Sequence, residues 1–507
     1  MSIDKTEPGP ELPNGWCWAT VGDTGRYING FAFKPEHREA TGRPIVRIQN
    51  LTDPEKSLNR TSLAVSDDFC VETGGMLVSW SATVDVFVWN REPALVNQHI
   101  FKVVPYENLV DRTFLFYWLK VAIDQLLDSE HLHGSTMKHI NRGPFMAHRI
   151  PLPPLPEQQR LAEKLEELLS DLDAGVAELK AAQRKLAQYR QSLLKAAVDG
   201  TLTADWRAAH GAPQETGAEL LQRILTERRA RWEQKQLAKY AEKGKTPPNN
   251  WQAKYPEPVV PTLTDLPPLP AGWAWATVDQ LASVGTGVTP LRSNRAYFEN
   301  GEVPWTTSGA LNEEVITAPS EHVTNLAVSE CRLDLYPIGT LLVAMYGEGK
   351  TRGKCAELAF PSTINQAIAA IVFQGYATAV APHVKTFFLD AYEAMRKQAS
   401  GGVQPNLNLQ IIKALCIPLP PLSEQVEVQV RLDEQLASYR RLKDSTSAAI
   451  AQSVAQRKNL LKAAFAGQLV PQDPNDEPAS ALLARIRAKH CEEVRERPST
   501  SRARKAR

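Results

Sequence analysis

The residues whose spacing comes nearest to a catalytic motif lie in a glycine-rich stretch, residues 346–353, which reads YGEGKTRG. Glu348 precedes Lys350 by two positions there, and Asp334 lies upstream. Acidic residues and a lysine at such spacing can bind a metal ion and position a water molecule, as a metal-dependent nuclease requires. The motif is short, its glycines favour a loop, and the first half of the chain has no counterpart to it. A solitary nuclease is therefore a subordinate hypothesis.

Two other groups of residues suggest catalysis but lack the necessary pattern. Thr246-Pro-Pro-Asn249 partly matches the Asn-Pro-Pro-aromatic signature of adenine methyltransferases, yet the order differs and the aromatic residue is missing. His131, His133 and His139 lie close in sequence, but no acidic residue or cysteine falls at ligand spacing around them. The sequence therefore predicts no catalytic residue, no metal site and no cofactor bound by this chain itself.

Cationic and amide side chains gather in two segments that suit nucleic acid. Residues 138–142 read KHINR, and residues 350–354 read KTRGK. Lysine and arginine neutralise phosphates, whereas asparagine, glutamine and arginine can also read base edges through paired hydrogen bonds. The candidate DNA-binding residues are Lys34, Arg47, Lys138, His139, Asn141, Arg142, Lys350, Arg352, Lys354 and Asn406.

The segments that carry these residues are not basic as a whole. Residues 16–150 contain 14 Lys and Arg against 15 Asp and Glu, and residues 273–417 contain 10 against 12. A DNA-binding surface on either segment therefore requires that charge be segregated onto one face, or that a partner contribute to binding.

The two segments belong to an internal duplication that organises the whole chain. LPNGWCWATV, from Leu12, returns as LPAGWAWATV from Leu269. IPLPPLPEQ, from Ile150, returns as IPLPPLSEQ from Ile417. A shorter landmark, VNQHI, corresponds to INQAI in the second copy, and similarity fades between the landmarks. This pattern is what two copies of one scaffold with different binding surfaces would have.

A long helix is predicted directly after each IPLPPL motif. From Glu157 to Val198 there is no proline and a single glycine, and strong helix formers dominate. The prolines at 151, 153, 154 and 156 predict an extended lead-in, and Gly200 is placed to end the helix. At 1.5 Å per residue, this helix would be about 65 Å long.

Leucines recur every seven residues along the first helix, which is the pattern of a coiled coil. The motif LLKAA-x-x-G-x-L ends both copies, so the partner predicted for the first helix is the second helix of the same chain. Two similar units that pair through the same helix favour a two-fold arrangement, which makes the helices antiparallel. The residues expected to pack between them are Leu165, Leu172, Leu179, Leu186, Leu193, Leu432, Leu442 and Leu460.

The diverged segments are predicted to contain both strands and helices. Runs rich in Val, Ile and aromatic residues predict strands at 44–51, 76–80, 84–89 and 100–104, and again at 303–307, 340–346 and 368–373. One helix is expected in each segment, at 111–127 and 384–398. The predicted fold class is α+β, with two similar mixed α/β domains separated by two long helices that form an intramolecular antiparallel coiled coil.

The expected organisation has six parts. These are a first domain at 1–150, the first long helix with its proline-rich lead-in at 151–202, a charged helical and proline-rich connector at 203–270, a second domain at 271–417, the second long helix at 418–470, and a C-terminal helix with a basic tail at 471–507. The helix of the connector is expected at 218–243, and its LLQRI sequence resembles LLARI in the C-terminal part.

Composition is compatible with this organisation. With 507 residues, the chain can hold roughly two to four domains. A net charge of +1, 43% hydrophobic residues and no long apolar run are not typical of a membrane-spanning or broadly disordered chain. The N-terminal sequence lacks the apolar segment of a secretory signal, and the six cysteines are scattered. These features predict a cytoplasmic protein.

This arrangement resembles the specificity subunit of a type I restriction–modification system, and the resemblance covers nearly the whole chain. It implies that each diverged domain is a target-recognition domain for one half of a split, asymmetric DNA sequence, and that the helices fix the gap between the halves. It also implies docking of two methyltransferase subunits, which bring S-adenosylmethionine, and of restriction subunits that use ATP and Mg. The chain itself would be non-catalytic. The long connector and the extended tail depart from the family pattern.

One further hypothesis of a different class remains open at this level. A coiled-coil adaptor could bind proteins through its variable domains without any DNA specificity.

Overall fold

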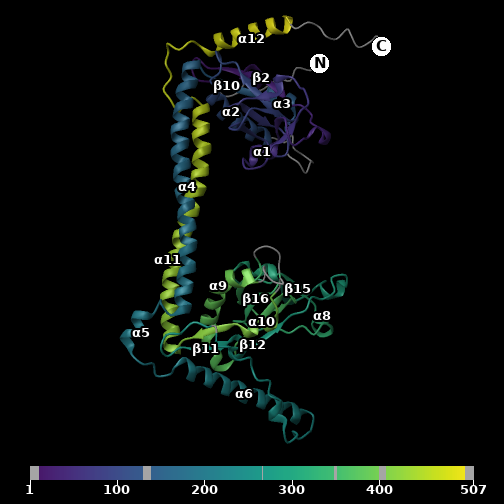
Figure 1. Ribbon diagram of the computed structural model, residues 1–507, viewed down its shortest axis with the longest axis vertical. Helices are drawn as coiled ribbons and strands as arrows, with labels where there is room; N and C mark the ends of the chain where they lie inside the picture. Colours follow the sequence, from purple (N-terminus) through teal and green to yellow (C-terminus); the bar gives the residue numbers. More distant parts are fainter. Residues whose placement is uncertain (1–10, 129–138, 265, 347–350, 399–406, 497–507) are drawn as a thin grey trace. The chain divides into compact units, whose positions relative to one another are not determined.

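The computed structural model of the chain describes residues 11–128, 139–264, 266–346, 351–398 and 407–496, with side chains up to residue 488. These residues fall into two compact units. Unit 1 comprises Met1–Lys180 and Ser447–Arg507, and unit 2 is Ala181–Thr446. Each unit contains one domain, a part of each long helix and a shorter helix at the edge of the domain (Figure 1).

Domain 1, in unit 1, combines sheets and helices as predicted. One four-stranded sheet has the order β2-β9-β6-β7, a second has the order β4-β3-β8-β5, and β1 pairs with β10. Phe114, Leu115 and Trp118 of its longest helix share a core with Phe101 of the first sheet. The strands are β1 Cys17–Thr20, β2 Gly25–Asn29, β3 Arg43–Val46, β4 Asn59–Thr61, β5 Cys70–Val71, β6 Met76–Ser79, β7 Asp85–Val88, β8 Ala94–Val96, β9 Ile100–Pro105 and β10 Arg149–Leu152, and the helices are α1 Ile48–Thr52, α2 Arg112–Asp128 and α3 Arg142–Ala147.

Domain 2, in unit 2, repeats this architecture. Its sheets have the orders β12-β19-β16-β17-β14, β15-β13-β18 and β11-β20. Val384 and Phe388 of its longest helix pack with Val343 of the largest sheet. The strands are β11 Ala274–Thr277, β12 Ser283–Thr286, β13 Val303–Thr306, β14 Val315–Ile316, β15 Glu321–Val323, β16 Leu341–Ala344, β17 Cys355–Leu358, β18 Thr363–Ile364, β19 Ile368–Val372 and β20 Cys416–Leu419, and the helices are α7 Val278–Leu281, α8 Asn325–Glu330, α9 Ala381–Gln398 and α10 Leu409–Ala414.

Three sequence predictions of local structure are wrong. The sequence predicts one helix in each diverged segment, but among the described residues domain 1 contains α1, α2 and α3, and domain 2 contains four helices, α7 to α10. The strand expected at 44–51 ends at Val46, and α1 follows, because the buried Asn50 side chain accepts a hydrogen bond from the Arg47 N–H (3.1 Å) and stabilises a helical turn instead. The first long helix begins at Leu155, so Pro156 lies inside it, in the first turn, where a proline has no N–H to leave unpaired.

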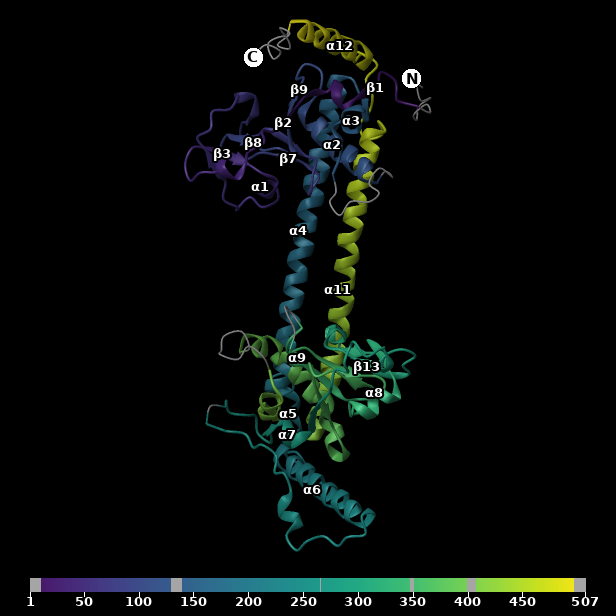
Figure 2. The same cartoon turned by 90° about the vertical axis from the view of Figure 1, so that its right-hand side faces the viewer.

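The two long helices are α4, Leu155–Asp199, and α11, Leu422–Phe465. They run side by side in each unit (Figure 2). In unit 1, Asp173 of α4 forms an ion pair with Arg457 of α11. In unit 2, Tyr189 Oη donates to Gln435 Oε1 at 2.8 Å. The residue number rises along α4 while it falls along α11, so the pair is antiparallel, as predicted.

The predicted seam between these helices is confirmed at its ends. Leu165, Leu193 and Leu432 are buried, and Leu172 and Leu460 pack against the core of unit 1. Leu179 and Leu186 are half-buried. The prediction for Leu442 is wrong, because its side chain is 55% exposed. Leu442 follows the buried Leu436 by six residues, which places it about 240° around the helix.

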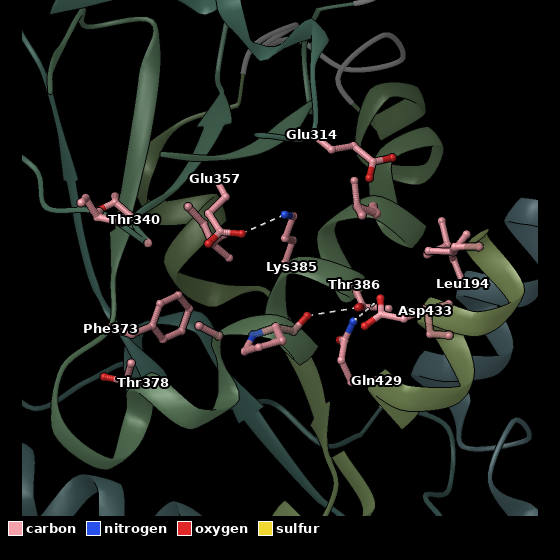
Figure 3. A pocket seen from close by; sticks show the side chains of 18 of the residues that line it. Leu194, Glu314, Thr340, Glu357, Phe373, Thr378, Lys385, Thr386, Gln429 and Asp433 are labelled. Atoms are coloured by element: carbon pink, nitrogen blue, oxygen red, sulfur yellow. Dashed lines mark hydrogen bonds and ion pairs between the residues drawn. The ribbon is translucent and has the colours of Figure 1, made fainter. Parts of the chain in front are cut away.

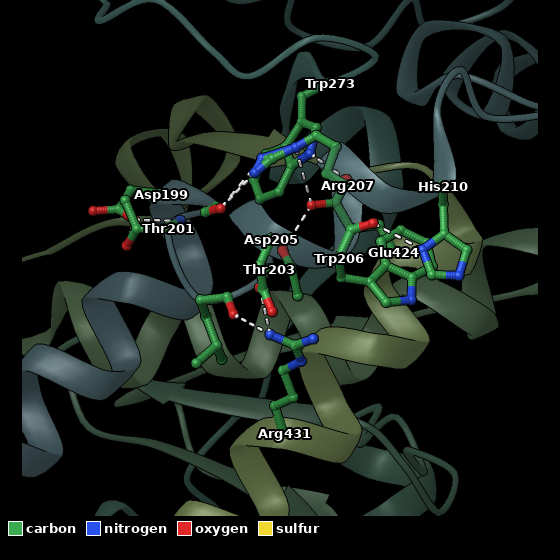
Figure 4. Close-up of polar contacts among 12 residues, drawn as sticks. Asp199, Thr201, Thr203, Asp205, Trp206, Arg207, His210, Trp273, Glu424 and Arg431 are labelled. Atoms are coloured by element: carbon green, nitrogen blue, oxygen red, sulfur yellow. Dashed lines mark hydrogen bonds and ion pairs between the residues drawn. The ribbon is translucent and has the colours of Figure 1, made fainter.

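A buried hydrogen bond joins the two repeated motifs, Gly-Trp and Glu-Gln, within each copy. Trp16 Nε1 donates to Glu157 Oε2 at 3.0 Å, and Trp273 Nε1 donates to Glu424 Oε2 at 2.8 Å (Figure 4). These residues flank the strand pairs β1–β10 and β11–β20, which have the same register in both copies. The following glutamine of each motif closes the turn, since Gln158 and Gln425 donate to Pro153 O and Pro420 O at 2.9 and 2.8 Å.

The end of each long helix packs on the tryptophan of the copy that lies in the same unit. Gly200, at φ +80°, follows α4, and a Cβ there would lie 2.9 Å from Trp273 Cζ2. Gly467, at φ +70°, follows α11, and a Cβ there would lie 3.2 Å from Trp16 Cζ2. The glycines of the LLKAA-x-x-G-x-L motif therefore provide both a left-handed helix stop and the space for an indole ring.

A shorter helix then closes each domain. In unit 2, α6 (Gly217–Glu242) follows α5 (Ala204–His210) and packs Leu220 and Ile224 into the core of domain 2. In unit 1, α12 (Ala479–Glu496) packs a matching set of residues into the core of domain 1, namely Ala479, Leu482, Leu483 and Ile486. The first backbone N–H of each helix donates to an equivalent carbonyl, Gly217 N to Gly272 O at 2.7 Å and Ala479 N to Gly15 O at 2.8 Å. Between α6 and β11, the connector contains a short helix, η5 (Trp251–Lys254).

Within the described ranges, none of the helices combines the length and apolar character that crossing a bilayer would need.

The tryptophan–glutamate bonds predict unequal contributions to stability. Trp16→Phe removes the donor from Glu157, whose other oxygen, Oε1, already lacks a partner among the described residues. Burial raises the pKa of Glu157, and the Trp16 bond opposes that rise. We expect Trp16→Phe to lower the free energy of unfolding by about 2 kcal/mol, within the range for an unsatisfied buried polar group. Trp273→Phe should cost less, because Thr203 still donates to Glu424 at 2.7 Å.

Denaturant unfolding followed by circular dichroism measures both variants. Trp206→Phe is the matched control, since Trp206 stacks on His210 at 4.3 Å and is not buried. Equal destabilisation by all three substitutions would contradict a specific role for the buried bonds.

Candidate nucleic-acid interface

Each of the two segments predicted to bind DNA belongs to an edge of its own domain, and the two edges correspond. In domain 1, the turn between β6 and β7 meets the segment before α3, where Ile140 N donates to Trp80 O at 2.9 Å. In domain 2, the turn between β16 and β17 meets the segment before α10, where Leu407 N donates to Met345 O at 3.2 Å. We call this the hairpin edge. Its described part is residues 80–84 and 139–142 in domain 1, and residues 345–346, 351–354 and 407–408 in domain 2.

Polar and aromatic side chains surround the hairpin edge of domain 1. Trp80 Nε1 donates to Asn29 Oδ1 at 3.2 Å, and the Trp80 and His99 rings lie 4.6 Å apart. The Arg142 guanidinium lies over the Phe101 ring at 5.7 Å, and its Nη2 donates to Tyr27 O at 3.3 Å. The structure therefore adds residues from the ends of β2, β6 and β9 to the predicted segment.

The predicted residues of this edge occupy different positions. His139 and Asn141 are exposed. His139 forms a backbone bridge with Ser81, and Asn141 occupies the N-cap position of α3 without a capping hydrogen bond from its side chain. Arg142 is exposed at the start of α3. Lys138 lies outside the described residues. The structure thus brings three of the four predicted residues to one edge.

The backbone also presents unusual positions at this edge. His99 and Ala82 have φ of +74° and +60°, in the left-handed region that few residues other than glycine adopt. Among the described residues, Asn97 Oδ1 and His99 Nδ1 are buried without a hydrogen-bond partner. The corresponding Asn365 Oδ1 of domain 2 instead accepts from Ala367 N at 3.2 Å. The edge of domain 1 thus retains polar atoms that the fold itself does not use.

Lys34 and Arg47 belong to a different part of domain 1. Lys34 precedes the turn at Pro35–His37 and pairs with Glu36 at 3.6 Å. Arg47 follows β3, in the second sheet. Partial burial and the positive charge of Arg38 lower the pKa of Arg47. Positive charges on Arg38 and Arg47 in this part of domain 1 suit phosphate.

At the hairpin edge of domain 2, Lys354 Nζ donates to Asn312 Oδ1 at 2.6 Å. Arg352 is half-buried, beside Gly353 at φ +81°. Lys350 and Asn406 lie outside the described residues. Two predicted cations are therefore described at this edge, on the hairpin that corresponds to the Trp80 turn.

The motif considered for a nuclease is not assembled by the described residues. Asp334 is exposed, and Glu348 and Lys350 lie outside the described ranges. In the part of the chain that the structure describes, no three His, Cys, Asp or Glu side chains come together at a distance that would hold a metal ion. His131 and His133 also lie outside that part.

A cavity of about 370 Å³ lies within unit 2, between domain 2 and the long helices (Figure 3). Glu357 and Lys385 face each other across it at 2.9 Å, and Gln429 donates to Asp433 at 2.9 Å. Arg190 of α4 pairs with the nearby Glu314 at 2.6 Å. Glu357 and Lys385 thus pair within domain 2, and the Arg190–Glu314 pair joins domain 2 to α4, so we assign no reactive group to the cavity.

Sequence reasoning missed Trp80, Asn29 and His99. The available signal was the landmark VNQHI, which both copies share and which ends at β9. Its repetition marks a fixed point of the scaffold, next to which the two copies differ. Trp80 and Asn29 had no such signal, because only the sheet order brings β2 beside β9 and β9 beside β6.

Known proteins with similar sequences share both copies of the repeat. A family model for the type I restriction modification DNA specificity domain matches residues 13–181 and 270–442. The EcoKI specificity subunit of Escherichia coli strain K12 is 24% identical over 503 residues, which are 94% of this chain and 96% of that relative. The EcoBI specificity subunit of Escherichia coli is 28% identical over 196 residues, so this match spans only 41% of that relative.

A chain from a structural study of complex assembly and conformational transition in the type I R-M system has the same fold. Its TM-score is 0.63 and its identity 15%, and the match covers 90% of this chain and 99% of that chain. At this level of identity the likeness concerns the fold alone. The family model matches more than half of the chain, once in each domain with the adjoining part of a long helix. The chain therefore belongs to the family of the type I restriction modification DNA specificity domain and carries two copies of that domain.

Proposed function

We propose that this chain is the DNA-recognition subunit of a type I restriction–modification complex, and that each domain reads one half of an asymmetric, bipartite target. The observation that carries this proposal is that both domains present the same hairpin edge with different side chains. Trp80, at the edge of domain 1, corresponds to Met345 in domain 2, and Arg142 corresponds to Leu409. A common frame with different edge chemistry suits two readers of unrelated half-sequences.

The scaffold beneath the two edges supports equivalent placement of both readers. Phe31 N donates to Val96 O at 2.8 Å in domain 1, and Val288 N donates to Ile364 O at 3.1 Å at the corresponding position of domain 2. The backbone contacts therefore recur where the side chains change. Substitutions at the edge can alter the bases recognised without altering the frame.

The long helices are the proposed spacer between the half-sites. Each unit contains an antiparallel part of the α4–α11 pair, and each helix has at least 44 residues. At 1.5 Å per residue, such a helix measures about 66 Å, roughly two turns of B-DNA. The gap between the half-sites would then follow from helix length.

The chain is proposed to be non-catalytic and to act with partner subunits. Its relatives are named as specificity subunits of restriction enzymes, which implies that other subunits carry the chemistry. Two methyltransferase subunits would bring S-adenosylmethionine, and restriction subunits would use ATP and Mg. We place the complex in the cytoplasm. The family match favours this function over a coiled-coil adaptor without DNA specificity.

Exchange of one domain tests the assignment of one half-site to each domain. Replacing residues 273–417 with the equivalent domain of another family member should change one half of the methylated sequence and leave the other unchanged. The frame contacts made by Trp273 and Ile417 are kept at the ends of the exchanged segment. Methylome sequencing of cells that carry the complete system provides the measurement, and a change in both halves would rule out independent readers.

Lengthening the spacer tests its role as a ruler. Four residues inserted near Ala182 in both α4 and the facing part of α11 add about 6 Å and turn the helices about 40° beyond one full turn. A coiled coil can absorb such an insertion by local unwinding. We expect the preferred gap to lengthen by nearly two base pairs at about 3.4 Å per pair, with both half-sequences unchanged. A two-residue insertion turns the seam by about 200° and should abolish activity. An active four-residue variant with an unchanged gap would show that the helices do not set the spacing.

Loss of charge at the edge of domain 1 tests phosphate binding. Arg142→Ala and Lys138→Ala should each weaken DNA binding. Each should also make the slope of the logarithm of the binding constant against the logarithm of salt concentration shallower by about 1, because each removes one phosphate contact. Arg142→Lys is the matched control, because it keeps the charge. Fluorescence anisotropy at several salt concentrations measures both quantities. An unchanged affinity and salt slope in both alanine variants would mean that this segment is only solvated.

A further inference from the structure

Most of α6 extends beyond the core that holds its first turns. Its buried residues are Gly217, Leu220 and Ile224, all in the first eight positions of a 26-residue helix. The following part is supported by an aromatic cluster, in which Trp232 stacks on Trp251 at 5.8 Å and meets Tyr255 edge-on at 5.4 Å. The family model does not match this segment, because it leaves 182–269 uncovered. Figure 1 shows α6 as a long helix at the border of unit 2.

A stripe of positive charge follows one side of this extended part. Its cations recur four residues apart, a step of about 6 Å along the helix and 40° around it. They are Arg231, Lys235, Lys239 and Lys243, and Arg228 precedes them on the same side. Two carboxylates of α6 lie on the same side of the helix: Glu227, four residues before Arg231, and Glu242 in the last turn.

The outer half of the stripe is not neutralised by this chain. Lys235, Lys239 and Lys243 are exposed, and no ion pair joins any of them to another described residue. Arg231, by contrast, pairs with Glu227 at 2.7 Å. Arg228 lies 3.8 Å from Asp279. Three consecutive members of the stripe are therefore free to meet an external anion.

A cavity of about 280 Å³ opens at the inner end of the stripe. Arg228, Arg231 and Lys235 line it, together with Trp232 and Tyr255. Two of its polar atoms, Arg228 Nη1 and Tyr255 Oη, are buried and lack a hydrogen-bond partner among the described residues. Both can donate to an anion. The cavity therefore supplies donors that continue the line of the three free lysines.

We propose that α6 is a phosphate-binding arm that holds the DNA backbone immediately outside the half-site read by domain 2. This inference rests on the proposed function, since it requires that the long helices span the gap. In unit 2, α6 begins beside the ends of those helices, where Thr203 donates to Glu424 at 2.7 Å and Gly217 N donates to Gly272 O. The spanning part of the helix pair leads away from this point. In the proposed complex, the arm would then contact the duplex that flanks the half-site of domain 2.

The chemistry of the stripe favours nucleic acid over a protein partner. A regular row of cations matches the regular row of phosphates on one DNA strand, and such contacts position a protein without reading sequence. A stable protein interface instead needs a central set of buried apolar or aromatic residues. In this part of α6, the large apolar side chain of Leu237 is 45% exposed, but it lies on the opposite side of the helix from the lysines and so cannot form the centre of an interface around them.

The test uses the complete complex with its methyltransferase partners and a duplex that contains the bipartite target. The variant is the triple substitution Lys235→Gln, Lys239→Gln and Lys243→Gln, and the control is the triple Lys→Arg substitution, which keeps the charges. Affinity is measured on duplexes with a long flank beyond the domain 2 half-site, with that flank removed, and with only the opposite flank removed. Size-exclusion chromatography checks assembly of each complex.

We expect the Gln variant to lose about three phosphate contacts, so its salt slope should be shallower by about 2.7. On the long-flank duplex, raising salt from 50 to 200 mM should then weaken the unmodified complex about 40-fold more than the variant. Removal of the domain 2 flank should abolish this difference, and removal of the opposite flank should not. The Arg variant should behave like the unmodified complex.

Other outcomes overturn the arm. If the Gln variant binds all duplexes like the unmodified complex, α6 does not contact DNA. If a smaller fraction of the Gln variant assembles, but the complexes that form bind every duplex as tightly as the unmodified complex, the stripe binds a partner protein. Failure of the proposed function itself is distinct, because the unmodified complex would then show no preference for the bipartite target on any duplex.

Discussion

The structure depends on one buried hydrogen bond that occurs twice, from the indole of Trp16 to Glu157 and from that of Trp273 to Glu424. Each bond ties the strand that opens a domain to the first turn of the long helix that leaves it. A buried carboxylate needs such a donor, because an unpaired polar group in the interior is costly. This requirement explains why the Gly-Trp and Glu-Gln motifs repeat together while the intervening sequence diverges.

The same tryptophans also pack against the end of the long helix that comes from the other copy. In unit 2, the glycine after α4 leaves room for Trp273, and in unit 1 the glycine after α11 leaves room for Trp16. The opening and closing motifs of the repeat therefore meet in space, although they come from different copies. Each unit is complete only with segments from both halves of the chain. Stability of either domain is thus linked to formation of the helix pair.

A rigid frame of this kind permits variation at its edge. The strands β2, β9 and β6 correspond to β12, β19 and β16, and their backbone contacts recur. Some side chains at the turns beyond those strands, such as Met345, still pack into a core, whereas His139 and Arg142 are exposed and can change without removing a core contact. A recognition subunit requires this separation, since base contacts give specificity and the scaffold fixes their position. α6 and α12 both pack their first turns into the core of a domain. The rest of α6 extends beyond that core and presents a basic surface.

The sequence alone determined the duplication, the two long helices and their antiparallel pairing, because these depend on local patterns: proline and glycine positions, leucine spacing and repeated motifs. It predicted seven of the twenty strands that the described residues contain, and six of these seven lie within two residues of the observed bounds. It failed where a side-chain contact overrides a local pattern, as when Asn50 replaces a strand with a helical turn. It also failed where the helix geometry turns a residue away from the seam, as at Leu442. The sequence predicted only part of the candidate site. Arg142 and Lys354 were identified as cations beside amides or glycines, but Trp80 was not. Only the sheet order, which sequence periodicity does not specify, brings the turn after β6 to the segment before α3. The burial of Glu157 and Glu424 was likewise decided by tertiary structure, because a glutamate at the start of a helix is ordinarily exposed and here meets an indole from a strand more than a hundred residues away.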